Sequence, residues 1–114
     1  MRCVGVSALS YAVLEDGLPI ALWGFAETSV DTACPWMLAS PALSTTHRAW
    51  LLRNTTKIVQ SGDRRWSHFR NRVDARNFVH VRWLRWAGFV VEEPEPFGPF
   101  NLPFRVFHRT VPNV

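Results

Sequence analysis

The chain has 114 residues, a length that fits one domain and buries somewhat over roughly 60% of the surface that the unfolded chain exposes. Six Trp and eight Phe supply a core, and the two cysteines, Cys3 and Cys34, match neither a disulfide framework nor a zinc motif. A net charge of +4 is modest for a dedicated nucleic-acid binder. With no apolar run of roughly 18–20 residues, these features exclude a membrane-spanning protein and indicate an intracellular one, in which Cys34 is expected to be an inert buried thiol.

The chain is expected to open with an antiparallel hairpin. Two β-rich runs, Leu9–Glu15 and Leu18–Ala26, flank Asp16-Gly17. Such a pair favours a tight turn because glycine takes positive φ at little cost. Residues 33–39 are short and apolar and predict a buried third strand, which Ser40-Pro41 ends.

Helices and strands alternate in the rest of the chain. Gly62 and Gly88 are natural helix terminators, and the prolines of Glu93–Pro99 remove amide donors, which predicts a loop there. The predicted elements are a helix from Ser44 or Thr45 to about Ser61, a strand at His68–Val73, a helix from Ala75 or Arg76 to Ala87, a strand at Phe89–Glu92 and a strand at Leu102–Arg109.

The second helix has a broad apolar face. At about 100° per residue, its apolar side chains share one side, and Arg82 and Arg85 lie on the other. We expect both tryptophans, Trp83 and Trp86, to anchor this helix on the sheet. The full apolar set is Val79, Trp83, Leu84, Trp86 and Ala87.

The order of elements predicts an α+β (mixed α/β) fold. It combines an antiparallel start with a strand–helix–strand core, which gives a central mixed sheet of about six strands with two main helices. We expect a single domain over residues 1–114, in which residues 1–8 form a lead-in and residues 110–114 a tail.

Several blocks of sequence resemble a known family. Asn77, Leu84 and Gly88-Phe89 reproduce the spacing N-x6-[Y/L]-x3-G-F that closes the domain of GNAT N-acetyltransferases. More closely, the chain resembles the small GNAT-like proteins of autographivirus-type bacteriophages, labelled internal virion protein A or left without a function. That resemblance implies a truncated GNAT-like fold, a phage origin and a place in the host cytoplasm or the virion. Its blocks are Pro35–Ser40, Val73–Asn77, Arg82–Phe89 and Phe104–Arg109.

One segment and one residue depart from the GNAT pattern. GNAT enzymes hold the coenzyme A pyrophosphate with a glycine-rich turn, because glycines let backbone N–H groups approach the phosphates. This chain has Ser40–Thr46 there, with no glycine. Leu84 occupies the place of the usual general-acid tyrosine and has no proton to donate. We therefore expect a catalytically degenerate protein without a cofactor; if acetyl-CoA or CoA binds, its contacts are Asn77, Ser44, Thr45 and Thr46.

Each candidate site residue has a functional and a structural interpretation. Asn77 either bonds a pantetheine arm, as the resemblance implies, or caps the turn after Asp74. His80 is either a base or a packed histidine. Seven arginines within one window either form a binding face for phosphate and carboxylate groups or a solvated surface. They are Arg64, Arg65, Arg70, Arg72, Arg76, Arg82 and Arg85.

Three functions fit the sequence. The first is binding of a protein, either a host enzyme or regulator or another virion component. The second is acyl-CoA-dependent N-acetyl transfer, and the third is nucleic-acid binding through the arginine window. The aromatic content also allows a homodimer. No metal site, membrane contact or confident catalytic residue is predicted.

Overall fold

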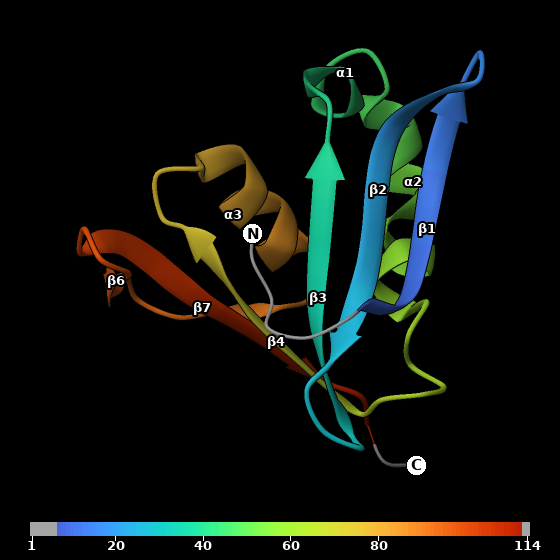
Figure 1. Ribbon diagram of the computed structural model, residues 1–114. Helices are drawn as coiled ribbons and strands as arrows, with labels where there is room; N and C mark the ends of the chain where they lie inside the picture. Colours follow the sequence, from blue (N-terminus) through green and yellow to red (C-terminus); the bar gives the residue numbers. More distant parts are fainter. Residues whose placement is uncertain (1–6, 113–114) are drawn as a thin grey trace.

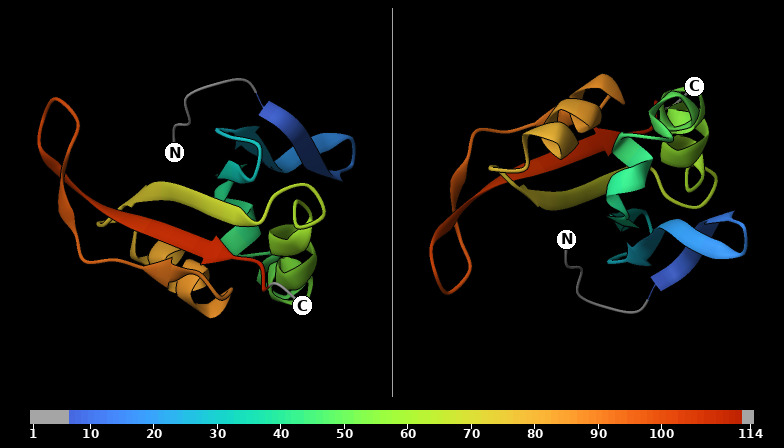
Figure 2. Two further views of the ribbon diagram at one scale, coloured as in Figure 1. Left: turned by 90° about the horizontal axis from the view of Figure 1, so that it is seen from below. Right: turned by 90° about the horizontal axis from the view of Figure 1, so that it is seen from above.

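The computed structural model describes residues 7–112 and shows one mixed sheet with its helices on one side (Figures 1 and 2). The strands follow the order β1-β2-β3-β4-β7-β5, and β6 pairs with β7. The elements are β1 Ser7–Glu15, β2 Leu18–Glu27, β3 Thr32–Ala39, α1 Pro41–Ser44, α2 Arg48–Gln60, β4 His68–Asp74, α3 Phe78–Trp86, β5 Val90–Val91, β6 Glu95–Phe97 and β7 Leu102–Thr110. The predicted fold class, a mixed sheet with two main helices, is confirmed.

The opening hairpin forms as expected. β1 and β2 are antiparallel and end with the pair Glu15↔Leu18. Asp16 and Gly17 have φ of 51° and 80°, the positive values that a two-residue type I′ turn needs at both central positions. β2 then pairs with β3 in a continuous antiparallel register from Ala21↔Ala39 to Glu27↔Ala33.

The core lies between the sheet and the two longer helices. Its largest fully enclosed side chains are Trp66, Phe69, Phe107 and Leu84. Trp83 of α3 packs against both clusters of buried side chains, and its Nε1–H donates to Thr55 Oγ1 of α2 at 3.0 Å. This contact ties the two helices together on one face of the sheet.

The first predicted helix is wrong at its start. Residues 41–44 form the separate short helix α1, and α2 begins only at Arg48, with His47 at the N-cap and no side-chain cap. The predicted caps Ser44, Thr45 and Thr46 therefore do not cap α2. Pro41 stands at the first position of α1, where proline has the right φ and loses no needed N–H, so the chain turns helical earlier than the polar run suggests.

The buried face of α3 is narrower than predicted. Val81 and Leu84 are buried and Trp83 is partly buried, but Trp86 is 60% exposed. The helix has only 9 residues, of which Val81 and Leu84 are buried, so the prediction that both tryptophans anchor it is right for Trp83 and wrong for Trp86.

The proline-containing stretch after β5 holds a strand that the sequence did not indicate. β6 pairs with β7 through Glu95↔Phe104, Pro96↔Pro103 and Phe97↔Leu102. The two prolines face each other, a position that needs no amide donor because alternate antiparallel pairs exchange no hydrogen bond. The prediction of a continuous loop over 93–99 is therefore wrong.

Two further predictions concern the start of the chain and Cys34. The predicted lead-in, residues 1–8, lies outside the described residues except for Ser7 and Ala8, which begin β1. Cys34 is buried in β3 and is disulfide-bonded. The expectation of an inert free thiol at this position is wrong, since the spacing of cysteines does not show which segments folding brings together.

Gly24 of β2 provides a test of the packing on the helix-free face. A Cβ at this position would lie 2.5 Å from the carbonyl oxygen of Leu9 and 2.6 Å from the Trp36 ring. We expect Gly24→Ala to lower the free energy of unfolding by about 1–3 kcal/mol, measured by urea denaturation.

A matched control is Ala12→Ser on the neighbouring strand, where the side chain is exposed. It should change stability by less than about 0.5 kcal/mol. Equal stability of Gly24→Ala and wild type would contradict the close approach of Trp36 and β1 to Gly24.

Candidate functional site

The sheet splits between β3 and β4, its two parallel neighbouring strands. β3 and β4 pair only through Thr32↔His68 and Ala33↔Phe69, and beyond these pairs the strands diverge, as Figure 1 shows. Pro35 lies two residues further along β3 and has no N–H with which to continue a ladder. Its carbonyl oxygen accepts a hydrogen bond from Asn71 Nδ2 at 2.7 Å. Asn71 was not singled out from the sequence; its only signal is a polar side chain at an inward position of a strand.

A cleft of about 740 Å³ occupies the space between the diverging strands. Its walls are mainly apolar, with one side supplied by the end of β3 and by the two helices that follow, and the other by β4, α3 and β7. The lining residues are Met37, Leu38, Ala39, Ser40, Pro41, Leu43 and Leu51 on the first side, and Arg72, Val73, Asp74, Asn77, Val79, His80, Trp83 and Phe104 on the second.

Four polar groups in the cleft have distinct environments. Ser40 Oγ and Arg72 Nε are buried and have no hydrogen-bond partner among residues 7–112. Burial lowers the pKa of His80 below its ordinary value of 6.5, which favours the neutral imidazole. The hydrogen bond from Arg76 lowers the pKa of Asp74 to about 2. The cleft therefore presents a neutral histidine and a donor on Arg72 that needs an acceptor.

Several backbone N–H groups of the segment after β3 are hydrogen-bonded within that segment. The backbone N–H groups of Leu43, His47 and Arg48 donate to the carbonyls of Ser40, Ala42 and Thr45. Pro41 has no N–H. Since a phosphate site at a helix start needs free N–H groups, this segment presents few donors to a pyrophosphate.

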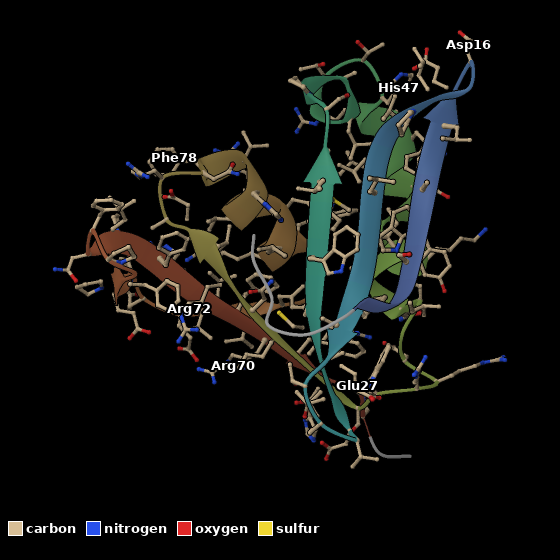
Figure 3. The ribbon with its side chains drawn as sticks, in the orientation of Figure 1. Asp16, Glu27, His47, Arg70, Arg72 and Phe78 are labelled. Carbon is tan, nitrogen blue, oxygen red and sulfur yellow. The ribbon has the colours of Figure 1, made fainter. Side chains whose placement is uncertain are left out.

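Of the predicted contacts in this segment, Thr45 and Thr46 are not brought into the cleft. Thr45 and Thr46 are exposed and do not line it, and Ser44 ends α1. Thr45 Oγ1 donates to the carbonyl of Pro41 at 2.9 Å. His47 Nε2 contacts the carboxylate of Glu15 at the hairpin end, in the region labelled in Figure 3. A side chain of the chain itself thus supplies the negative charge beside the start of α2.

The two positions that carry the GNAT spacing have structural roles. Asn77 lines the cleft and is the N-cap of α3, its side chain accepting from the His80 N–H at 3.2 Å. Leu84 is 2% exposed and belongs to the main core cluster, and it does not line the cleft. At position 84, therefore, no proton donor is available to a reacting group in the cleft.

The seven arginines of the window are divided by the sheet. Phe69 and Val73 face α3 in the core, so Arg70 and Arg72, which alternate with them on β4, lie on the helix-free face (Figure 3). Arg82 and Arg85 are exposed on α3, across the sheet. The other three lie on connectors: Arg64 is exposed, Arg65 lies 4.8 Å from the Trp66 ring centroid, and Arg76 pairs with Asp74 at 2.7 Å.

Within the described part of the chain, no three His, Cys, Asp or Glu side chains come close enough to hold a metal ion. Over the same residues, every helix is too short or too polar to cross a lipid bilayer.

Comparisons with known proteins identify the fold of the chain but not its function. No protein-family model and no curated protein matches the chain. Among solved structures, a GNAT-family acetyltransferase from Streptococcus pneumoniae aligns with a TM-score of 0.70 and 12% identity over 90% of this chain and 66% of its own. A putative phosphinothricin N-acetyltransferase gives 0.69 and 12% over 91% and 72%. A putative acetyltransferase from Salmonella typhimurium, solved with its cofactor acetyl-CoA, gives 0.67 and 16% over 92% and 65%.

These likenesses establish a GNAT-like fold for residues 7–112, as the sequence resemblance implied. The chain spans about two thirds of the length of these neighbours. At such low identity, the activities in their names remain statements about those proteins.

The role of Asn77 can be tested by two substitutions. We expect Asn77→Ala to lower the free energy of unfolding by about 1 kcal/mol, because the N-cap acceptor is lost. Asn77→Asp keeps an acceptor and should stay close to wild type. Urea denaturation measures both. Unchanged stability of Asn77→Ala together with weaker binding of acetyl-CoA would instead support a pantetheine contact.

His80 predicts a pH dependence of stability. The folded chain keeps the imidazole neutral at a pH where the unfolded chain binds a proton, so stability is present above pH 6.5 and falls as the pH drops through the window below that value. We expect His80→Gln to lose less stability than wild type between about pH 7.5 and about pH 5.5. An NMR titration midpoint of His80 at or above 6.5 would contradict this.

Proposed function

We propose that this chain is a phage-encoded, catalytically degenerate GNAT-like protein that works by binding another protein. The phage origin rests on the resemblance of its four sequence blocks. The partner is a host enzyme or regulator that it modulates, or a component of the virion. A place in the host cytoplasm follows from the same proposal.

The observation that carries the proposal is the outward face of α3. Phe78, Arg82 and Trp86 follow one another at a spacing of four residues, so they stand in one row on a helix. Phe78 is 71% exposed and Trp86 is 60% exposed, and Arg82 and Arg85 are exposed beside them. Trp and Arg are enriched in the energetic centres of protein interfaces, and Phe is enriched in interfaces in general. Figure 3 shows Phe78 at the start of this helix.

The charge of this row indicates the kind of partner. Residues 78–86 hold two arginines and no acidic residue. An interface that buries Trp86 and Phe78 would pair the arginines with carboxylates. We therefore propose a partner surface that is apolar at its centre and acidic at its rim.

Two features weigh against acetyl transfer. The N–H groups of Leu43, His47 and Arg48 after β3 are bonded to carbonyls of the same segment, and Leu84 is enclosed in the core. An enzyme of this fold would have to bind the pyrophosphate without that turn and protonate the leaving thiolate from another group.

Acyl-CoA-dependent N-acetyl transfer is the second candidate, and the cleft favours it. Its volume of about 740 Å³ lies within the range of roughly 300–1,000 Å³ for small-molecule sites. A neutral His80 in its wall is in the protonation state of a general base. One neighbour of the same fold is solved with acetyl-CoA. Nucleic-acid binding has less support, because the sheet separates the arginines that it would use.

Affinity capture from cells of the bacterial host tests the protein-binding proposal. We expect Trp86→Ala with Arg82→Glu to reduce the recovered partner at least about tenfold, since both side chains are exposed and their loss leaves the fold intact. Arg64→Glu, on an exposed connector, is the matched control and should retain the partner. Equal recovery by all three proteins, or no partner that depends on α3, would overturn the proposal.

Calorimetry with acetyl-CoA separates the two candidates. The first predicts no heat of binding up to about 1 mM ligand, a concentration at which even a weak site is occupied. Micromolar binding together with release of free thiol in the presence of an amine acceptor would establish the second.

A further inference from the structure

The two edges of the sheet are built differently. The edge at β5 has only the two residues Val90–Val91, and Pro94 and Pro96 follow it. Short strands and prolines are the usual protection of an edge against pairing with another chain. The edge at β1 is a strand of 9 residues with no proline, and its one charged residue is Glu15 at the end. Only β1 therefore lacks this protection.

The middle of β1 is regular. Its pairing with β2 is interrupted between Ser7 and Leu9 and again between Val13 and Leu14. Such irregularities twist an edge away from a partner, but they leave Leu9–Val13 in continuous register. No other described strand borders the outer side of this stretch, as Figure 1 shows. Its outward N–H and C=O groups are therefore free to pair with an added strand.

We propose that two copies of this chain join antiparallel through β1, with the two-fold axis at Tyr11. In a two-fold interface the same residues meet one another, so the strand must tolerate its own copy. With Tyr11 at the axis, Leu9 faces Val13 of the partner and Ser10 faces Ala12 of the partner. Glu15 faces the partner's Ser7, so no like charges are opposed.

Tyr11 suits the central position. It is 37% exposed and stacks on Trp23 of the neighbouring strand, with ring centroids 5.2 Å apart. In the dimer its free edge would meet the partner's Tyr11, which extends the stack across the axis. Aromatic cross-strand pairs stabilise adjacent strands. Ala12, on the opposite face of the strand, is small and exposed and leaves room for the partner.

The size of the contact sets the expected strength. Five residues span only about 17 Å of strand, so a contact between two such single strands buries less area than a standard interface of roughly 1,200–2,000 Å². The dimer is therefore expected to form reversibly and to depend on concentration. β1 and α3 lie at opposite sides of the molecule (Figure 1), so a dimer of this kind would keep both α3 faces accessible.

Sedimentation equilibrium tests the proposal with the full chain. We expect the weight-average mass of wild type to rise from 13.1 kDa at about 10 µM towards twice that value at about 500 µM. Ala12→Lys and Ala12→Glu should each remain monomeric, because the two introduced charges lie diagonally across the axis. An equimolar mixture of the two variants should recover the dimer, which a merely unfolded variant could not do.

Val90→Lys, on the opposite edge, is the matched control and should associate like wild type. Hydrogen exchange of residues 9–13 should slow with protein concentration in wild type and in Val90→Lys, and in neither variant at position 12. Monomeric wild type at about 500 µM, open-ended polymers, or failure of the mixture to recover would overturn the proposal. None of these outcomes bears on the role of α3.

Discussion

The structure depends on the early end of parallel pairing between β3 and β4. Two residue pairs hold these strands together, and then Pro35 withholds an amide donor while Asn71 takes its carbonyl oxygen. Asn71 thereby satisfies a buried acceptor that a continued ladder would otherwise have used. This local exchange lets the strands diverge without leaving the Pro35 carbonyl unbonded, and the cleft follows from it.

Packing against the helices holds the two halves of the sheet together. The two halves share few backbone hydrogen bonds, so side-chain packing has to connect them. Trp83 contributes to this packing from α3, because its ring packs against both clusters of buried side chains and its N–H donates to Thr55 of α2. With both helices on one face, the other face carries Arg70 and Arg72, and the latter lies 4.3 Å from the Phe97 ring centroid.

The chain thus combines a GNAT-like fold with a cleft whose surroundings differ from the GNAT sequence pattern at two places. The cleft is open and partly polar, but three N–H groups of the segment beside it are bonded within that segment, and Leu84 contributes to packing. Exposed aromatic and arginine side chains lie on α3 and an unprotected strand edge lies at β1. The two proposals assign these features to protein contacts, with a foreign partner at α3 and with a second copy of the chain at β1.

The sequence by itself determined the fold class and most of the elements. Strand alternation, the Asp16-Gly17 turn and the spacing from Asn77 to Gly88 are local signals, because each depends on the geometry of one strand, turn or helix. These signals placed Leu84 within the last helix, and the resemblance to GNAT enzymes identified the missing glycine turn.

Only the tertiary structure decided which side chains share a surface. The arginines are close in sequence, yet alternation along β4 and the crossing of α3 put them on opposite faces of the sheet. Trp86 fits an apolar helical pattern, but a helix of 9 residues buries too narrow a face to enclose it. Pairings such as Asn71 with Pro35 and Pro96 with Pro103 join segments far apart in the chain or break a local rule. The free energy of each pairing depends on a second residue that the local sequence pattern does not identify.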